Sequence, residues 1–260
     1  MKSFFHAFFM CQSMFCAIPC PCKIWDEDAR DKLLWCLPLV GLEIGLLWWC
    51  LGLLCRFLGL SQAVSGIALC AMPFFATGFI HLDGFMDVTD AVGSCRDLAK
   101  RREILKDSHA GAFAVITAAV YFVTWYGAYD QLYTSENLRA IGIMSLGFMV
   151  SRCLSGIGVI TFPKAKADGT VAEFSRNSSD VISRNVLVVY LVVLAAVMIW
   201  IQPIWGIAAI VEALVVFGYY HHIAMKYFGG TTGDISGFFL CICEAGMAVV
   251  LAVVSNLFVM

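Results

Sequence analysis

Charged residues are scarce in this chain. They make up 14% of its 260 residues, whereas hydrophobic residues make up 61%. A soluble globular domain carries roughly 25% charged residues. A soluble protein is therefore excluded, and the mean hydropathy of +0.84 indicates an integral membrane protein. The net charge is only −2, which gives no sign of a nucleic-acid partner. Nothing in the composition predicts an oligomeric state.

Alternating polar and apolar residues are missing from the long hydrophobic runs, and internal repeats and low-complexity tracts are missing as well. The first absence excludes the strands of a membrane barrel, which leaves helices as the way to satisfy backbone polar groups in lipid. We therefore predict an all-α, polytopic membrane helix bundle of six to seven spans, with residues 1–260 forming one domain. The candidate spans are Leu33–Cys55, Gln62–His81, Ala110–Ala128, Ala140–Phe162, Val186–Ile201, Ile204–Tyr220 and Ser236–Phe258. The fifth and sixth are short and meet at "QPIW", which is typical of a tight hairpin or one broken helix.

A standard metal-binding cysteine pattern is also missing. Four of the twelve cysteines cluster near the start, with the spacing C-x4-C-x3-C-x-C, which is not a zinc-ligand pattern. The same N-terminal segment, 1–32, resembles a signal peptide in its early Lys2 and its apolar run. However, His6 and Gln12 interrupt that run, and it is rich in phenylalanine. We therefore predict that 1–32 is an interfacial segment whose helix lies on the membrane.

Basic residues are distributed unevenly between the two sides of the predicted bundle. With the N-terminus in the cytoplasm, only Arg56 and Arg139 fall in outside loops and Arg152 falls within a span, so the other 14 of the 17 Lys and Arg lie in inside segments. Cytoplasmic loops carry such an excess. The long loops 82–109, 163–185 and 221–235 are therefore predicted to be cytoplasmic, and the functional surface with them.

Three aspartates follow the second predicted span in the stretch "IHLDGFMDVTD". Asp83, Asp87 and Asp90 are spaced i, i+4 and i+7, which places them on one face of a helix. Like charges in this arrangement repel, and no basic residue lies within "LDGFMDVTDAVGS". A hard divalent cation such as Mg²⁺ is the natural partner of clustered carboxylate oxygens, and Gly84 would allow a ligand or another helix to approach the backbone closely. The alternative interpretation is a solvated acidic helix end.

The next stretch, "RDLAKRREILKDSHAG", has the opposite charge. Arg96, Arg101, Arg102 and Lys106 are candidates for holding phosphate oxygens beside the metal. Positive-inside topology and contact with anionic lipid would also explain them. Asp107 lies four residues after Glu103, so the two could form a second metal site or simply pair with these bases.

Two further features lie in or beside the predicted spans. Arg152 and Glu244 are ionisable groups in lipid, where they are costly and indicate function. We expect Arg152 to point into the site, toward a cluster carboxylate or a substrate diphosphate. The loop "GGTTGDISG" before the last span contains Thr232, Gly233 and Asp234. Its amides and hydroxyls could bind an anion, with Asp234 either reaching the metal or capping the following helix.

Taken together, these motifs resemble the signature of the adenosylcobinamide-GDP ribazoletransferase family, also called cobalamin (5′-phosphate) synthase. "HLDGFMDVTDAVGSCRD…RREILKDSHAGAFAV" is similar to its H-x-D-G-x-x-D-x-x-D block and the E-I-x-[KR]-D-S-x-x-G that follows. "IPCPCKIW", "LPLVGLEIG", "SRC" and "GGTTGDISG…E" resemble other family segments, so the similarity covers most of the chain. Cys241 departs from the pattern, because the family has a first glutamate there and Glu244 is left alone.

The resemblance implies an Mg²⁺-dependent phosphotransferase in the bacterial cytoplasmic membrane, with its active site facing the cytoplasm. It would join adenosylcobinamide-GDP to α-ribazole or its 5′-phosphate, releasing GMP. Asp83, Asp87 and Asp90 would hold Mg²⁺, with His81, Asp107 and Asp234 as further catalytic candidates. Arg96, Arg101, Arg102, Lys106, Arg152, Thr232 and Gly233 would bind substrate. His81, Asp90 and His109 all remain candidates for the base that takes the ribose hydroxyl proton.

Two other classes of protein remain as alternatives. A CDP-alcohol phosphatidyltransferase also uses aspartates at a membrane helix end, but its D-x-x-D-G-x-x-A-R pattern is not met, because "FMDV" follows Asp83-Gly84. An ion-coupled transporter would place its site near the bilayer midplane on broken helices. Here the carboxylates are predicted at the cytoplasmic edge, which disfavours a transporter.

Overall fold

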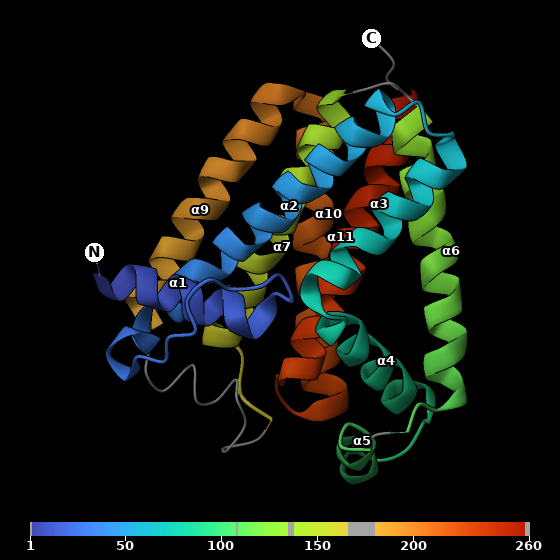
Figure 1. Ribbon diagram of the computed structural model, residues 1–260. Helices are drawn as coiled ribbons and strands as arrows, with labels where there is room; N and C mark the ends of the chain where they lie inside the picture. Colours follow the sequence, from blue (N-terminus) through green and yellow to red (C-terminus); the bar gives the residue numbers. More distant parts are fainter. Residues whose placement is uncertain (1, 108, 135–137, 166–179, 258–260) are drawn as a thin grey trace.

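The computed structural model describes residues 2–107, 109–134, 138–165 and 180–257, and these ranges are helical apart from short connections (Figure 1). The all-α prediction is confirmed for this part of the chain, where the only strand-like feature is an isolated bridge between Lys164 and Thr231. The elements are α1 (Lys2–Phe15), η1 (Glu27–Lys32), α2 (Leu33–Phe57), α3 (Gln62–Thr77), α4 (Ile80–Gly93), α5 (Leu98–Ile104), α6 (Ala112–Thr134), α7 (Leu138–Thr161), α9 (Asp180–Ile201), α10 (Pro203–Ile223), η2 (Ala224–Phe228) and α11 (Gly233–Leu257).

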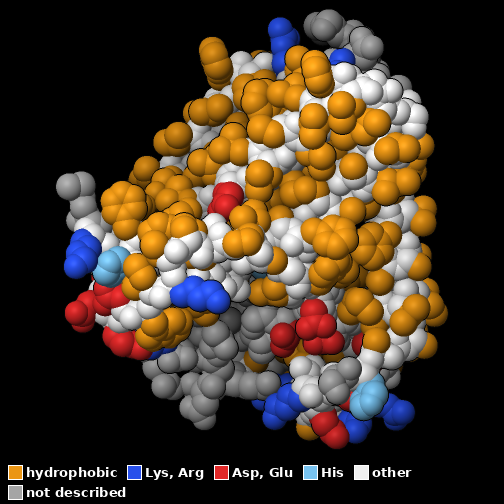
Figure 2. Space-filling view, in the orientation of Figure 1, with side chains coloured by type: hydrophobic (Ala, Val, Ile, Leu, Met, Phe, Trp, Pro, Cys, Tyr) orange, Lys and Arg blue, Asp and Glu red, His pale blue; other side chains and the backbone are white. Residues whose placement is uncertain are grey.

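Within the described ranges, six helices are long and apolar enough to cross a membrane, and a seventh span is counted if the bent pair α3–α4 is one. The six are α2, α6, α7, α9, α10 and α11. The predicted multi-pass bundle is confirmed. α7 is the most buried of these helices, and it packs against α2, α6, α9, α10 and α11. Large apolar side chains such as Trp200 and Val215 are exposed, and hydrophobic side chains cover the flank of the bundle (Figure 2), which suits contact with lipid.

Close helix packing depends on glycines, as is common in membrane bundles. Gly41 and Gly45 of α2 lie directly against the backbone of α7 at Phe148 and Ser145. The fifth and sixth predicted spans form a hairpin of two separate helices, α9 and α10. The side chain of Gln202 in the turn accepts a hydrogen bond of 2.9 Å from the amide of Trp205, which caps the start of α10.

The second predicted span, Gln62–His81, is wrong in its extent. α3 ends at Thr77 after 16 residues, and α4 then leaves at 94° to it. Gly78 and Phe79 both have left-handed backbone angles (φ 61° and 65°), and their amides bond back to the last carbonyls of α3. The sequence stays hydrophobic through this turn because Phe79 and Ile80 are apolar. A hydropathy profile therefore does not detect the end of α3. The bend places His81 and the aspartates on a separate helix.

The predicted inside segments meet at one end of the bundle (Figure 1). The 229–232 loop pairs with the end of α7, where the amide of Thr231 donates to Pro163 (2.8 Å). α5 bonds to the end of η2 through Arg102. The predicted grouping of these loops is therefore confirmed for the described residues, whereas 166–179 lie outside them.

The N-terminal helix α1 packs on α2 at the same end, with Ala7, Met10 and Cys11 buried. Its position is held by a hydrogen bond of 2.6 Å between the His6 ring and the Asp26 carboxylate and by one of 3.2 Å from Gln12 to Glu43. The location of this segment at a membrane surface stays a prediction.

Candidate active site

The three aspartates lie on one continuous helix, α4, as their spacing predicts. Asp83 is exposed, and Asp87 and Asp90 are half-buried. Acidic side chains gather at this end of the molecule (Figure 2). Burial, together with the charges of Asp83, Asp234 and Asp90, raises the pKa of Asp87 to about 7. The carboxylates are therefore near enough to oppose each other's ionisation, which is the electrostatic state that a bound cation relieves.

The fourth acidic residue, Asp234, comes from the start of α11. Asp90 and Asp234 are 144 residues apart in the chain, yet α4 and α11 pack together at Gly84. A Cβ at Gly84 would lie 2.7 Å from the Asp234 carbonyl oxygen and 2.9 Å from its Cα. The close approach predicted for Gly84 and the meeting of the two motifs are both confirmed. Thr232 caps the start of α11, because its hydroxyl accepts from the amide of Ile235 (3.3 Å) and also donates to the Asp234 carboxylate (3.4 Å).

The donor set suits a hard divalent cation, because it consists of carboxylate oxygens. Burial and, after it, repulsion by the neighbouring carboxylates raise the pKa of Asp87. Among the described residues, no three His, Cys, Asp or Glu side chains are already arranged to hold an ion. The carboxylate of Asp90 instead accepts a hydrogen bond of 3.4 Å from the amide of Ala114, in the first turn of α6. Mg²⁺ at Asp83, Asp87 and Asp90 therefore remains a proposal.

A cavity of about 360 Å³ opens beside the aspartates. Asp83 and Asp234 line it, together with His81, which is 9% exposed and whose Nε2 is buried without a hydrogen-bond partner among the described residues. The rest of the wall is largely apolar and comes from helices far apart in the chain: Met14, Phe15, Leu34, Leu37, Ile80, Ser155, Val159, Gly233, Ser236, Gly237 and Leu240. The site thus joins carboxylates to an apolar pocket.

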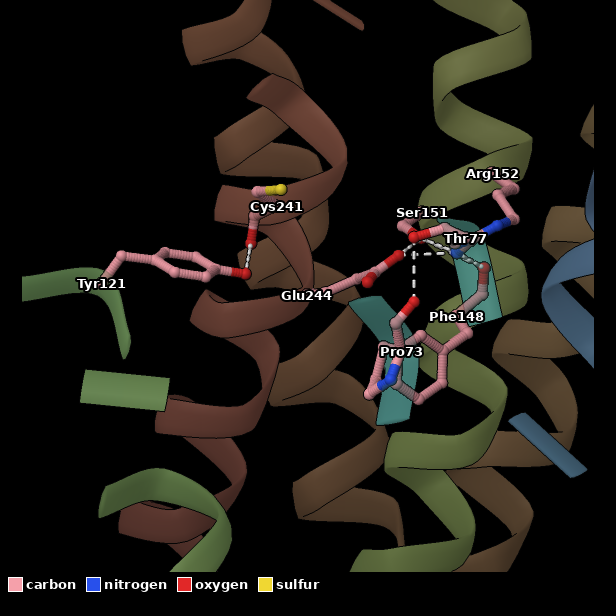
Figure 3. A network of polar contacts seen from close by, with 8 residues as sticks. All are labelled: Pro73, Thr77, Tyr121, Phe148, Ser151, Arg152, Cys241 and Glu244. Carbon is pink, nitrogen blue, oxygen red and sulfur yellow. Dashed lines mark hydrogen bonds and ion pairs between the residues drawn. The ribbon is translucent and has the colours of Figure 1, made fainter. Parts of the chain in front are cut away.

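Arg152 lies in the core rather than against the aspartates. It is 1% exposed, and its guanidinium donates to Glu244 (2.6 Å) and to the Phe148 carbonyl (2.9 Å), while Ser151 also donates to Glu244 (2.8 Å; Figure 3). The prediction of a cluster carboxylate as its protein partner is therefore wrong. A buried guanidinium needs an opposite charge next to it, and Glu244 on the facing helix α11 supplies that charge. The contact of Arg152 with substrate stays a prediction.

The predicted substrate-binding bases in and beside α5 divide into two groups. Arg102 donates twice to the Phe228 carbonyl (3.0 and 2.6 Å), and Arg101 lies over the ring of Tyr227 (4.8 Å). These two residues hold α5 against the loop that leads to Asp234. Arg96 and Lys106 are exposed. Their predicted contact with substrate stays a prediction.

Asp107 is separate from the aspartate group in the described structure. It is exposed and pairs with His109 (2.8 Å), and the hydrogen bonds from His109 lower the pKa of Asp107. Among the described residues, no hydrogen bond or ion pair joins Asp107, Arg96 or Lys106 to Asp83, Asp87 or Asp90. Asp107 as a catalytic group remains a prediction without a geometric link to the other carboxylates.

Sequence reasoning missed Tyr220. Its hydroxyl is buried and lies 2.6 Å from the hydroxyl of Thr231 and 2.8 Å from that of Ser236. It therefore joins the residues on both sides of Asp234 and fixes the loop in place. The available signal was weak, because "GYYHH" looks like the polar end of an ordinary span. The contribution of Met14 and Phe15 to the cavity was missed as well, because residues 1–32 were interpreted only as a surface anchor.

The fold and the site define a polytopic membrane protein with a group of aspartates beside a largely apolar cavity at one end of its helix bundle. The comparisons with known proteins are more specific. The family model described as cobalamin-5-phosphate synthase matches residues 7–252. The chain belongs to this family.

Curated relatives agree with the family match. An adenosylcobinamide-GDP ribazoletransferase of Lachnoclostridium phytofermentans is 37% identical over 242 residues, covering 92% of this chain and 91% of that protein. One of the same name from Clostridium botulinum (strain Alaska E43 / Type E3) is 32% identical, with coverage of 94% and 96%. Another from Desulfitobacterium hafniense (strain Y51) is 32% identical and covers 85% of each chain. No solved structure matches the chain significantly.

Proposed function

We propose that this chain joins adenosylcobinamide-GDP to α-ribazole, or to α-ribazole 5′-phosphate, and releases GMP. The observation that carries the proposal is the meeting of the α4 aspartates with Asp234 beside an apolar cavity. An adenosylcobinamide-GDP ribazoletransferase, as the relatives are named, needs such a combination, because it breaks a diphosphate next to an aromatic nucleoside. The curated relatives do not favour a phosphatidyltransferase or a transporter.

The reaction exchanges one phosphorus–oxygen bond for another. A ribose hydroxyl loses its proton, and its oxygen bonds to the corrinoid-linked phosphorus. The bond from that phosphorus to the GMP oxygen breaks, and GMP leaves. Positioning and charge stabilisation supply most of the catalysis in such transfers. The residues of α4 and α11 would align the hydroxyl with the diphosphate.

The proposed cofactor is Mg²⁺, held by Asp83, Asp87 and Asp90 with Asp234 beside them. When bound, it would neutralise phosphate oxygens that four carboxylates alone would repel. Thr232 and Gly233 are proposed to contact the diphosphate, because Gly233 is exposed at the open start of α11. Of the three candidate bases, His81 is best placed because it lines the cavity. Asp90 is engaged with α6, and His109 is paired with Asp107 at the surface.

The proposed location is the bacterial cytoplasmic membrane, with the site facing the cytoplasm. The supporting observation is that the segments rich in Lys and Arg share one end of the bundle with the aspartates. Nucleotide substrates are also cytoplasmic. An epitope inserted at position 100 should be detected only after cells are permeabilised. Detection in intact cells would contradict this orientation.

The proposed activity has a direct test. Membranes from cells that express the chain are incubated with both substrates, and GMP is measured by chromatography. We expect GMP only when both substrates are present, loss of GMP with a chelator, and recovery with Mg²⁺. Membranes that carry Asp87→Asn serve as the matched control. Wild-type membranes that release no GMP from the two substrates would contradict the proposed function.

A further inference from the structure

The two proposed substrates differ greatly in size, and the cavity beside the aspartates is small. Its volume is about 360 Å³, near the lower end of the range of ligand pockets, roughly 300–1,000 Å³. A nucleoside fits such a space. A corrin ring with its metal and side chains is several times larger and does not.

The walls of the cavity favour one kind of base. Most lining side chains are apolar, such as Leu37, Val159 and Leu240, and the last two are 5% and 3% exposed. A guanine ring carries several donors and acceptors, and burying them without partners is costly. A benzimidazole ring has an apolar body and very few polar atoms. Of the two aromatic bases that the reaction brings together, the benzimidazole is the better match.

The cavity also has polar groups that could bind a ribose. Asp83 and Asp234 line it, and Gly237 brings α11 against the backbone of His81, where a Cβ would lie 3.1 Å from the His81 carbonyl oxygen. The Nε2 atom of His81 is buried and has no hydrogen-bond partner among the described residues. Burying such an atom costs free energy unless a ligand supplies its hydrogen-bond partner. A ribose hydroxyl held there would stand next to the carboxylates.

From these observations we propose that this cavity is the binding site of the acceptor nucleoside, with the aromatic base of α-ribazole among the apolar side chains of α2, α7 and α11 and its ribose at His81, Asp83 and Asp234. The GDP-activated corrinoid then approaches from the open side of the aspartates. This proposal rests on the proposed function, because it assigns one of the two substrates of that reaction. It makes Val159 and Leu240 determinants of base specificity.

The test uses the full chain in detergent micelles and varies each substrate in turn. Val159→Phe narrows the cavity and replaces none of its carboxylates. We expect it to raise the KM for α-ribazole about tenfold or more, the equivalent of about 1.4 kcal/mol, and to change the KM for the GDP-corrinoid less than about twofold. The matched control is Val192→Phe on α9, where the valine is 62% exposed and both KM values should stay unchanged.

A second variant keeps the test decisive if Val159→Phe does not fold. Val159→Ala enlarges the cavity and should raise the relative kcat/KM for a riboside with a larger, naphthalene-fused imidazole base. Independently, equilibrium dialysis with α-ribazole alone should show binding to the wild type that is weakened severalfold by His81→Gln.

The outcomes separate the two proposals. A selective rise in the KM for the GDP-corrinoid in Val159→Phe would place guanine in the cavity and overturn the assignment. Unchanged KM values in a folded Val159→Phe, or unchanged base preference in Val159→Ala, would also overturn it. In those cases the wild type still releases GMP, so the proposed function stands. A wild type that binds α-ribazole but releases no GMP would contradict the function and not the binding site.

Discussion

Gly84 is the point at which the two halves of the site touch, so a single methyl group there should disturb catalysis more than folding. In Gly84→Ala the new Cβ would lie 2.7 Å from the carbonyl oxygen of Asp234. Unstrained contacts begin near 3.5 Å, so α4 and α11 must separate by about 0.5 to 0.8 Å. Overpacking of this kind costs roughly 1–3 kcal/mol, and alanine returns up to about 1 kcal/mol through its better helix propensity.

The effect on rate should exceed the effect on stability. Displacing a reacting group by about 1 Å can cost roughly 100-fold, so we expect kcat to fall about 10- to 100-fold while the variant still folds. The assay is GMP release at saturating substrates, with thermal unfolding in the same micelles. The matched control is Gly142→Ala on α7, where a Cβ meets no atom within 4 Å and both readouts should stay at or above the wild-type level. A folded Gly84→Ala with the wild-type kcat would refute the idea that α4 and α11 must stay in close contact.

Three further perturbations follow from particular contacts. Arg152→Met leaves Glu244 buried without its counter-charge and should lower the free energy of unfolding by about 3–5 kcal/mol. The double variant with Glu244→Leu should recover most of the lost stability. Equal losses of stability in the single and double variants would contradict the ion-pair account. Because the pKa of Asp87 is raised to about 7, a proton competes with the cation as pH falls below 7, and the half-saturating Mg²⁺ concentration should rise by up to about tenfold per pH unit. Asp83→Asn removes one repelling charge, so the pH at which this rise begins should be lower in that variant. An unchanged pH would count against repulsion between Asp83 and Asp87. Arg102→Ala removes both hydrogen bonds to the Phe228 carbonyl and should reduce GMP release severalfold. The control Lys100→Ala loses only an exposed ion pair with Glu103 and should keep the wild-type rate. Equal rates in the two variants would mean that α5 does not help to position the 229–232 loop.

The helix that carries the aspartates could be predicted from the sequence because three like charges at i, i+4 and i+7 form a recognisable pattern. Its meeting with Asp234 was also predictable, since the distribution of Lys and Arg puts both segments on one side and Gly84 marks a close approach. In both cases a local pattern and a topological rule point to the same answer.

Other features of the site depend on information that a hydropathy count does not hold. The turn at Gly78 and Phe79 is a change in backbone angles within an apolar run, so the second span seemed longer than it is. For Arg152, the cost of burial predicts that a carboxylate must be near, but the helix register decides which one, and α11 presents Glu244. Tyr220 was missed because a tyrosine at a span end usually needs no further explanation, and only the fold brings it to Thr231 and Ser236.

The central claim is that α4 and α11 form one active site for this transfer. Single-turnover GMP release by the purified chain tests it most directly, with wild type, Asp87→Asn, Asp234→Asn and the double variant compared across Mg²⁺ concentrations. Residues that act as a unit are not additive, so each single variant should lose about 100-fold or more while still folding, and the double variant should be little worse than either. A full rate for Asp234→Asn at limiting Mg²⁺ would contradict the account and leave the site to the α4 aspartates alone.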